Sequence, residues 1–570
     1  MDNASTLPPT VPVVPSIAVQ DQHLDTPARL WPWLALIGAV AGLVSAAVML
    51  WAARAWDGVI LAQLLSDRMT WLLPTAVFGR VLGELENNAK PLTLVSLTVL
   101  QMVLGAALAV AFTRRAAVRG IAAHAAAGLL LSAIVWALLS FVAAPLGQIG
   151  LLGLDATGDL WRVQGTFIAA SLSFGAVVAL GLSLLRRERV AVVPMAVAVD
   201  AVGDGEAEPR LQPTRRTVLR GGMAGIGALL LGLPSAVSAV YVGRYARSVR
   251  EKSAAPQART ETDVNGGPFA FAGMPFPVTP ADEFYVVSKN LVDPTVDTSS
   301  WSLEIGGLVD RPLVLSYTDL LARESVEFTS TLECISNPVG GTYISNGVWR
   351  GFALKDLLEE AGVKSGVIDL ELHAADGYVE SFPLAEGMAA DTMIVHSLNG
   401  ELLPSGHGAP ARLIVPGIFG MKNVKWVTRI DAVGEDIKGF WQERGWSDPA
   451  PVMTMSRIDV PKAGADVVLG QPTQYGGVAF AGDRGISRVE VSFDDGGTWQ
   501  DAELDAELSP LSWRLWRLEH APLAGGNDGA QFVRVRATDG TGATQTAEER
   551  NTLPDGATGY HRVRTKVVTA

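Results

Sequence analysis

The chain has 570 residues and a net charge of −13, and its composition is 49% hydrophobic but only 18% charged. Its length predicts about three or four domains, and its mean hydropathy of +0.27 is too high for an ordinary soluble protein. No basic block of the kind that nucleic acid requires is present, so nucleic acid is excluded as a partner.

The first 245 residues hold the hydrophobic excess and predict a membrane domain. Residues 1–29 lack apolar periodicity and are expected to form a disordered cytoplasmic tail. Within 30–245, five apolar runs approach the roughly 20 residues that cross a bilayer. These predicted spans are 30–53, 91–112, 121–144, 161–185 and 221–241. Charged residues interrupt 56–89, which is therefore predicted to be an amphipathic surface segment.

The distribution of Lys and Arg predicts the orientation of these spans. Arginines fill the connections 113–120 and 186–220, whereas the connection 147–160 has only acidic charges. Because short basic loops stay in the cytoplasm, the N-terminus is expected inside and everything after the fifth span outside. The sequence thus predicts a multi-pass protein of the cell membrane, with the lipid bilayer as a partner.

A twin arginine precedes the fifth span. Thr214-Arg-Arg-Thr-Val-Leu-Arg220 resembles a twin-arginine export signal, although cytoplasmic positive charge alone would also explain it. We expect an uncleaved anchor here. The twin-arginine route carries folded proteins, so a cofactor can be inserted before export. Residues 246–268, which are polar and contain Gly and Pro, are predicted to be a linker.

Residues 269–450 change to short strands and helices, which indicates an α+β domain. Alternating apolar residues predict strands at 301–305, 313–315, 369–373 and 412–416. Residues 352–362 have the apolar spacing of a helix.

Cys334 is the only cysteine of the chain, so it cannot form an internal disulfide. Zinc and iron–sulfur sites need further cysteines, and no His-rich loop follows to build a copper site. A buried hydrophobic role stays open. So does a Cys–His nucleophile, with His373, His396 or His407 as the base. The remaining alternative is a metal whose other ligands come from an organic cofactor.

Leu332-Glu-Cys-Ile-Ser-Asn337 resembles the motif of the sulfite oxidase family, in which one cysteine binds molybdenum and a pyranopterin dithiolene supplies two sulfurs. Further segments resemble family motifs in the same order along the chain, at 279–285, 349–358, 378–384, 399–404, 407–412 and 423–426. The resemblance implies Mo-molybdopterin, with one molybdenum per chain, and oxygen-atom transfer on a small-molecule substrate.

The resemblance also implies the residues of the site. Cys334 is the expected metal ligand, and Tyr378 the expected catalytic tyrosine near molybdenum. Arg412 suits a phosphate because it binds bidentately, and Lys425 adds a point charge. The expected cofactor-binding residues are Asp282, Tyr285, Asn337, His407, Arg412, Asn423, Val424 and Lys425.

Two departures from the family concern the substrate. Sulfite-oxidising members carry arginines after Cys-x-x-Asn, where Pro338 and Val339 stand here, and after Phe-Tyr, where Val286 follows. Each lost charge-assisted bond is worth about 1.5–3 kcal/mol. A sulfite dehydrogenase therefore becomes the lesser alternative, and a neutral S- or N-oxide reductase is equally defensible. Lys289, Arg350 or Lys422 are candidates to compensate.

Residues 451–570 contain short alternating strands with Asp-Gly turns, which predict an immunoglobulin-like β-sandwich. This domain resembles the family's dimerisation domain, so a homodimer is the expectation, although five spans in each protomer restrain pairing. No haem domain accompanies it, so electrons must be exchanged with a separate carrier, such as a cytochrome or a quinone system. A cofactor-free membrane-tethered scaffold is the alternative from another class.

Overall fold

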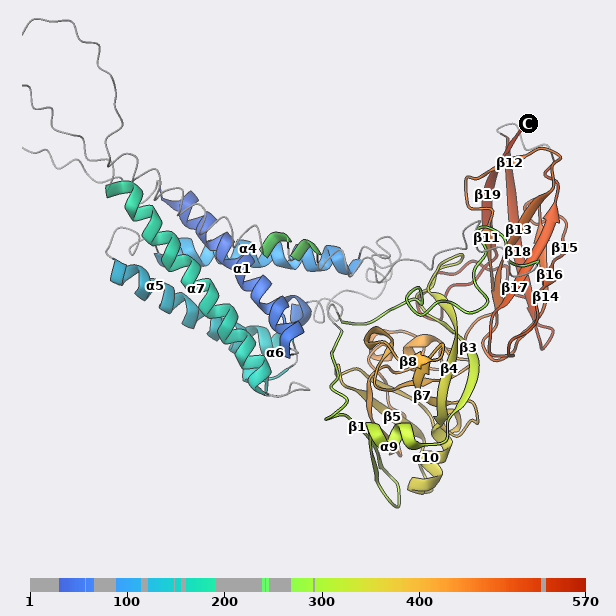
Figure 1. Ribbon diagram of the computed structural model, residues 1–570, viewed down its shortest axis with the longest axis horizontal. Coiled ribbons are helices and arrows are strands. Elements are labelled where there is room, and N and C mark those ends of the chain that lie inside the picture. Colours follow the sequence, from blue (N-terminus) through green and yellow to red (C-terminus); the bar gives the residue numbers. More distant parts are fainter. Residues whose placement is uncertain are drawn as a thin grey trace, which may run out of the picture.

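A computed structural model describes an N-terminal helical bundle followed by two β-rich units (Figure 1). The described residues are 30–56, 58–65, 89–113, 121–147, 149–154, 160–190, 238–240, 242–244, 268–290, 293–523 and 529–569. The predicted tail lies outside these ranges, as do the twin-arginine segment, nearly all of the linker and most of the fifth predicted span.

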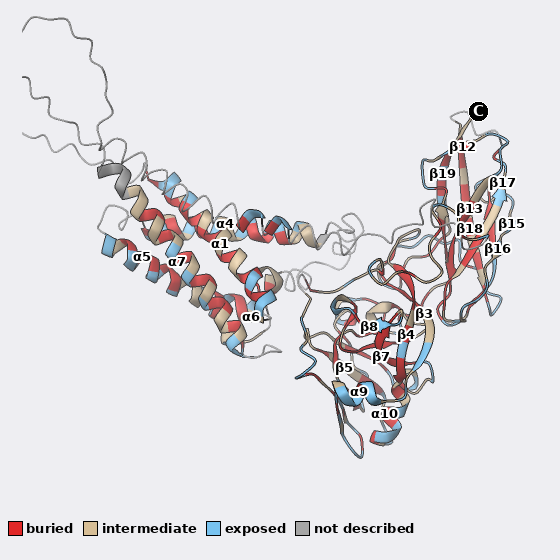
Figure 2. Ribbon diagram, viewed as in Figure 1, coloured by how far each residue is buried: buried red, intermediate tan, exposed pale blue. Residues whose placement is uncertain are grey.

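Among the described residues, four helices are long and apolar enough to cross a membrane. They are α1 (Trp31–Trp56), α4 (Ala89–Thr113), α5 (Ile121–Leu138) with its continuation through η3 (Leu139–Ala143) and α6 (Ala144–Leu146), and α7 (Leu160–Val190). Leu129 and Val103 are 66% and 58% exposed on the outside of the bundle. Exposed apolar residues recur along these helices, as expected of surfaces that face lipid (Figure 2).

Small residues allow the helices to pack closely. A Cβ atom at Gly38 of α1 would lie 2.3 Å from the carbonyl oxygen of Gly105 in α4, and one at Gly128 of α5 would lie 2.6 Å from that of Gly175 in α7. These approaches are possible only without side chains. In the segment predicted to lie on the surface, Leu64 is buried and packs against Gly147.

The central unit consists of two sheets around one core. The first has the order β2-β1-β10-β5-β6, and the second has the order β3-β4-β7-β8 with β9 also paired to β7. Their bounds are β1 Ser302–Gly307, β2 Leu313–Ser316, β3 Val326–Glu333, β4 Ile344–Ala353, β5 Asp369–Ala374, β6 Val379–Pro383, β7 Met393–Leu398, β8 Glu401–Leu402, β9 Arg412–Ile414 and β10 Val427–Val433.

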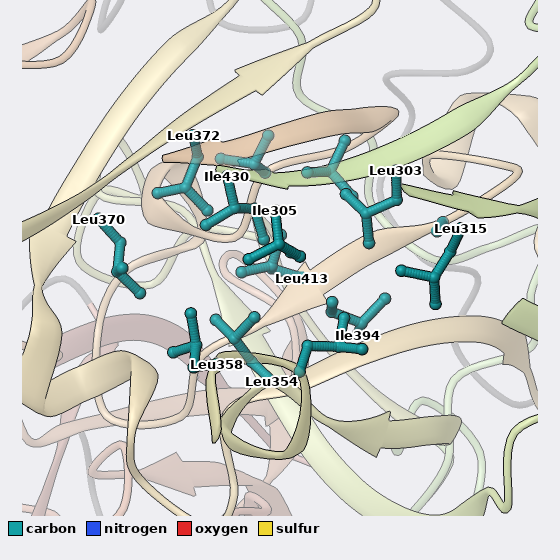
Figure 3. Close-up of a cluster of buried hydrophobic side chains, with 14 of the residues drawn as sticks. Leu303, Ile305, Leu315, Leu354, Leu358, Leu370, Leu372, Ile394, Leu413 and Ile430 are labelled. Carbon is teal, nitrogen blue, oxygen red and sulfur yellow. The ribbon is translucent and has the colours of Figure 1, made fainter. Parts of the chain in front are cut away.

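The core of this unit forms because alternate strand residues and one helix face are apolar. Leu303, Ile305 and Ile430 meet Leu354 and Leu358 of α10 (Leu354–Ala361) in one buried cluster (Figure 3). The helix ends at Gly362, whose φ of 72° favours glycine. The capping box of Ser316 and Asp319 starts the short α9 (Tyr317–Ala322).

The C-terminal unit also contains two sheets, with the orders β11-β13-β17-β16 and β12-β19-β18-β14-β15. Their bounds are β11 Met455–Val460, β12 Asp466–Val468, β13 Thr473–Phe480, β14 Ile486–Ser492, β15 Gln500–Asp501, β16 Glu503–Leu504, β17 Arg514–His520, β18 Ala530–Asp539 and β19 His561–Val568. Tyr475, Trp516 and Val533 are buried in its core. A two-sheet unit of this kind is compatible with the predicted sandwich.

This unit packs directly on the loop that carries Cys334. The Arg457 guanidinium donates to the carbonyl of Gly341 at 2.8 Å, and a Cβ atom at Gly340 would lie 2.3 Å from the ring of His561. The amide of Ile458 donates to Nδ1 of His561 at 2.9 Å, so this nitrogen is unprotonated. Burial, together with the charge of Arg457, lowers the pKa of His561 to about 4.

We therefore expect His561 to make the protein acid-sensitive. Between pH 6.5 and about 4 the unfolded chain binds a proton at this position that the folded chain does not, so stability falls as the pH falls. The full effect is about 3–4 kcal/mol, or roughly 5 °C or more in the melting temperature. Melting curves at pH 7 and pH 5 should show a smaller acid shift for His561→Gln than for the wild type, and equal shifts would contradict the expectation.

Candidate functional site

The Cys334 loop connects the antiparallel strands β3 and β4. The amide of Asn337 donates to the carbonyl of Cys334 at 2.9 Å, and that of Gly341 to Pro338 at 2.8 Å, which makes two successive turns. Gly340 has a φ of 75°, a conformation that favours glycine at this position. The Pro and Gly residues of the motif thus fix the loop at the end of β3.

The thiol of Cys334 is 8% exposed and contacts the Ser336 hydroxyl, with an Sγ–Oγ distance of 3.0 Å. Burial raises the pKa of this thiol, although the bonds with Ser336 oppose the shift. A thiolate is therefore unfavourable here without an added positive charge. A bound metal ion is such a charge.

Tyr285 is influenced by the charges of both Cys334 and Arg412. Burial raises its pKa well above the usual value, and the charge of Cys334 adds to the increase while that of Arg412 opposes it. Its amide donates to the hydroxyl of Ser345 at 3.1 Å, and its own hydroxyl lies 2.8 Å from where Gly420 would carry a Cβ. Tyr285 is therefore close enough to the cysteine and to the predicted phosphate-binding end to be affected by the charges of both.

Arg412 is 5% exposed, and its guanidinium donates to three backbone carbonyls. The acceptors are those of His407 at 3.1 Å, Asn423 at 3.1 Å and Leu413 at 3.3 Å. It also lies over the ring of the buried Trp349, at 5.4 Å from the centroid. Burial lowers its pKa to about 10. Among the described residues no carboxylate pairs with it, and a buried charge without a counterion is costly.

Lys425 and His407 adjoin this guanidinium. The Lys425 ammonium donates to the carbonyl of Gly406 at 3.2 Å and lies 4.2 Å from the ring centroid of Trp426. Burial lowers its pKa to about 8, and no carboxylate in the described part of the chain forms an ion pair with it. His407 donates from Nε2 to the carbonyl of Ala281 at 3.0 Å, which leaves Nδ1 as the acceptor. Burial lowers the pKa of His407 to about 4.

Three other predicted residues contact the rest of the protein around the site. Asn337 donates to Glu333 and accepts from the amide of Tyr343, so both ends of its side chain hold the cysteine loop. Asn423 accepts from the amide of Val415 and donates to the carbonyl of Phe419. Val424 lies in the core of the central unit. Cofactor contacts by these three residues stay predictions, and Asp282 is exposed.

Tyr378 belongs to a series of hydrogen-bonded polar side chains. The sequence analysis named Tyr378 but did not predict this series. Its hydroxyl lies 2.7 Å from a carboxylate oxygen of Glu380 and 2.9 Å from the carbonyl of Met421. The other oxygen of Glu380 lies 3.2 Å from the ammonium of Lys422, and both side chains are almost fully buried. Burial raises the pKa of Glu380, although the charge of Lys422 opposes it.

The series continues to the surface through Asp448. Its carboxylate, whose side chain is 38% exposed, lies 3.2 Å from the ammonium of Lys422 and also pairs with Lys438. Lys422 thus forms ion pairs with two carboxylates. Of the other two candidates for an anion pocket, Lys289 donates to the carbonyl of Asp376, and Arg350 is exposed on β4.

No histidine among the described residues hydrogen-bonds Cys334. His396 contacts Ser325 and Ser397, and His373 lies beside Glu371 and Asp431 on the outer face of the first sheet. These contacts and the raised pKa of the thiol argue against a Cys–His nucleophile.

Comparison with known proteins identifies two domains. The family described as oxidoreductase molybdopterin binding domain matches residues 290–441, and the Mo-co oxidoreductase dimerisation domain matches 452–568. Human mitochondrial sulfite oxidase is 31% identical over 46% of this chain and 56% of its own length. A nitrate reductase [NADH] of Brassica napus is 29% identical over 49% of this chain and 36% of its own length. The chain thus spans about half the length of the curated sulfite oxidases that it matches.

A solved structure, that of the sulfane dehydrogenase SoxCD from Paracoccus pantotrophus, aligns with a TM-score of 0.44 and 25% identity, over 51% of this chain and 84% of that one.

The residues described above fit a molybdopterin. Arg412 and Lys425 lack carboxylate partners in the described structure and suit its phosphate, and the buried thiol of Cys334 suits its metal.

Proposed function

The chain belongs to the sulfite oxidase family of molybdopterin-dependent oxidoreductases, and we propose that it is a membrane-anchored enzyme for two-electron oxygen-atom transfer on a small neutral substrate. The observation that carries this proposal is the set formed by Cys334, Tyr285 and Arg412. In this set the charges of a buried thiol and of a buried cation, which has no carboxylate partner among the described residues, both act on one tyrosine.

Cys334 would ligate the metal, while Arg412 and Lys425 would hold the phosphate. When bound, the molybdenum centre supplies oxygen-atom exchange with the substrate. Oxidation of a substrate X follows X + H2O → XO + 2H⁺ + 2e⁻, and reduction of XO is the reverse. Both directions therefore move protons, and the electrons pass to or from a separate carrier, a cytochrome or a quinone.

The series of polar side chains that begins at Tyr378 suits the movement of these protons. Burial and the charge of Glu380 raise the pKa of Tyr378 well above its usual value, so its hydroxyl can pass a proton to Glu380 only as it receives another from the site. The raised pKa of Glu380 makes it a better proton acceptor than an ordinary carboxylate. Lys422 then relays to Asp448 at the surface, since its ammonium contacts both carboxylates at 3.2 Å. Each group in this series is within hydrogen-bonding distance of the next.

The charges near the cysteine favour a neutral substrate. Lys422 is paired with Glu380 and Asp448, and Arg457 is paired with Asp459 and bonded to Gly341. Pro338 and Val339 add no charge to the loop. An S- or N-oxide needs no guanidinium pocket, whereas a sulfite dianion does. A sulfite dehydrogenase is therefore the second candidate.

We expect the purified full-length protein to reduce dimethyl sulfoxide or trimethylamine N-oxide with a reduced viologen dye. Its kcat/KM should exceed that for sulfite oxidation with ferricyanide by about tenfold or more, because a dianion would lack charge-assisted bonds. Tyr378→Phe should lower kcat for either reaction. A preference for sulfite would establish the second candidate, and well-folded protein without molybdenum or pterin would favour the scaffold.

The remaining parts follow from the sequence. Basic loops and the twin arginine support an anchor with the catalytic and C-terminal units on the extracytoplasmic side. The two-sheet C-terminal unit supports an immunoglobulin-like sandwich, and its match to a dimerisation domain supports a homodimer.

A further inference from the structure

The start of α4 contacts the central unit through a side chain. The ammonium of Lys90 donates to the backbone carbonyl of Asn290 at 2.9 Å, across 200 residues of sequence. Lys90 is the second residue of α4 and the first of its candidate membrane span. A lysine at this position can reach out of the bilayer while its helix stays in it.

Asn290 is itself part of the candidate site. Its side-chain amide donates to the carboxylate of Asp376 at 2.7 Å, and its carbonyl oxygen Oδ1 accepts from Lys289 at 3.1 Å. Asp376 in turn accepts from the amide of Tyr378 at 3.0 Å. Lys90 therefore bonds to Asn290, whose side chain in turn holds Asp376 in the turn before Tyr378.

Lys90 is also close enough to the predicted phosphate-binding end to act on its charges. The pKa of Lys425 is lowered first by burial and then by the charges of Arg412 and Lys90, while Asp293 opposes them. Four cations gather here, namely Lys90, Lys289, Arg412 and Lys425, with the carboxylates of Asp293 and Asp376 near them. The excess is positive, as an anionic ligand requires.

A charge on a second helix also acts on this segment of the central unit. The charge of Arg162, near the start of α7, reaches the carboxylate of Asp297, whose pKa is lowered mainly by hydrogen bonds from Ser299 and further by Arg162. α4 and α7 both begin at this end of the bundle, which agrees with two spans that run in the same direction across the membrane.

We propose that Lys90 is a positioning residue of the cofactor site, through which the membrane bundle holds Asn290 and Asp376 in place beside the cations that would bind the anionic phosphate end of the pterin. The bundle then does more than anchor the enzyme. Lys90 supplies one positive charge near the phosphate-binding end and one hydrogen bond that holds Asn290, and both favour retention of the cofactor. This inference rests on the proposed function.

The test compares Lys90→Met, Lys90→Arg and the wild type as full-length proteins in detergent. Lys355→Met is the matched control, because this exposed lysine of α10 pairs with Glu359 of its own helix. Molybdenum and pterin per chain are measured after purification, and pterin loss is followed during dialysis. Lys90→Met should lose pterin about tenfold faster than the wild type, a loss typical of removed supporting contacts, while Lys90→Arg and Lys355→Met should retain it.

Equal retention by Lys90→Met and the wild type would overturn this inference and leave the proposed function intact. So would faster loss in Lys355→Met, because the effect would then be independent of position. A wild type without molybdenum and pterin would overturn the proposed function and this inference together.

Discussion

Replacing Cys334 by Ser should abolish the thiolate-to-molybdenum absorption of the purified protein and lower its oxygen-transfer activity by at least about 100-fold. Loss of a group that only supports a metal ligand already costs about 10–100-fold, and Cys334 is the only thiol of the chain. Molybdenum per chain and the visible spectrum are the measurements. The wild type should hold one molybdenum, and Cys334→Ser should hold less.

The matched control is Ser336→Ala, which removes the hydroxyl 3.0 Å from the sulfur and leaves the sulfur itself. It should retain both the metal and the absorption band. An unchanged spectrum in Cys334→Ser would mean that the thiol is a buried side chain without a role at the metal.

Replacing Lys422 by Met should destabilise the protein by about 3–5 kcal/mol, because it breaks a buried ion pair by removing one partner. The Glu380 side chain is fully buried, and without the ammonium 3.2 Å away its charge has no counterion among the described residues. Thermal unfolding followed by circular dichroism should show a loss of roughly 10 °C.

Two variants make this result specific. Lys438→Met removes a partly exposed partner of Asp448 and should cost no more than about 1 kcal/mol. The double variant Glu380→Gln with Lys422→Met should recover much of the loss, because no buried charge is left unpaired. If Lys438→Met and Lys422→Met were equally unstable, the buried pair would not be the cause.

Local sequence patterns predicted much of the secondary structure. The predicted strands at 301–305, 369–373 and 412–416 correspond to β1, β5 and β9, and the predicted helix at 352–362 to α10. Four of the five predicted spans coincide with apolar helices of the structure. The order of strands in the sheets was not predictable, because β1 pairs with β10 more than 100 residues later.

The sequence singled out candidate site residues where a residue type has one obvious chemistry. Cys334 stood out because it has no partner cysteine, and Arg412 because cations suit phosphate. Glu380 did not stand out, although it lies two residues after Tyr378. Lys422 was a candidate anion ligand, but its partners, the buried Glu380 and the partly exposed Asp448, come from other parts of the chain. Lys90 depends on a contact that no local pattern reveals.

The three carbonyls around Arg412 have a consequence for how the protein would receive its ligand. They belong to His407, Leu413 and Asn423, so one guanidinium joins the loop that ends at His407 to the loop that ends at Asn423. Its position is determined by folding and not by the ligand. Association then requires little loss of conformational entropy in the receptor, because the recognition geometry is preorganised before the encounter.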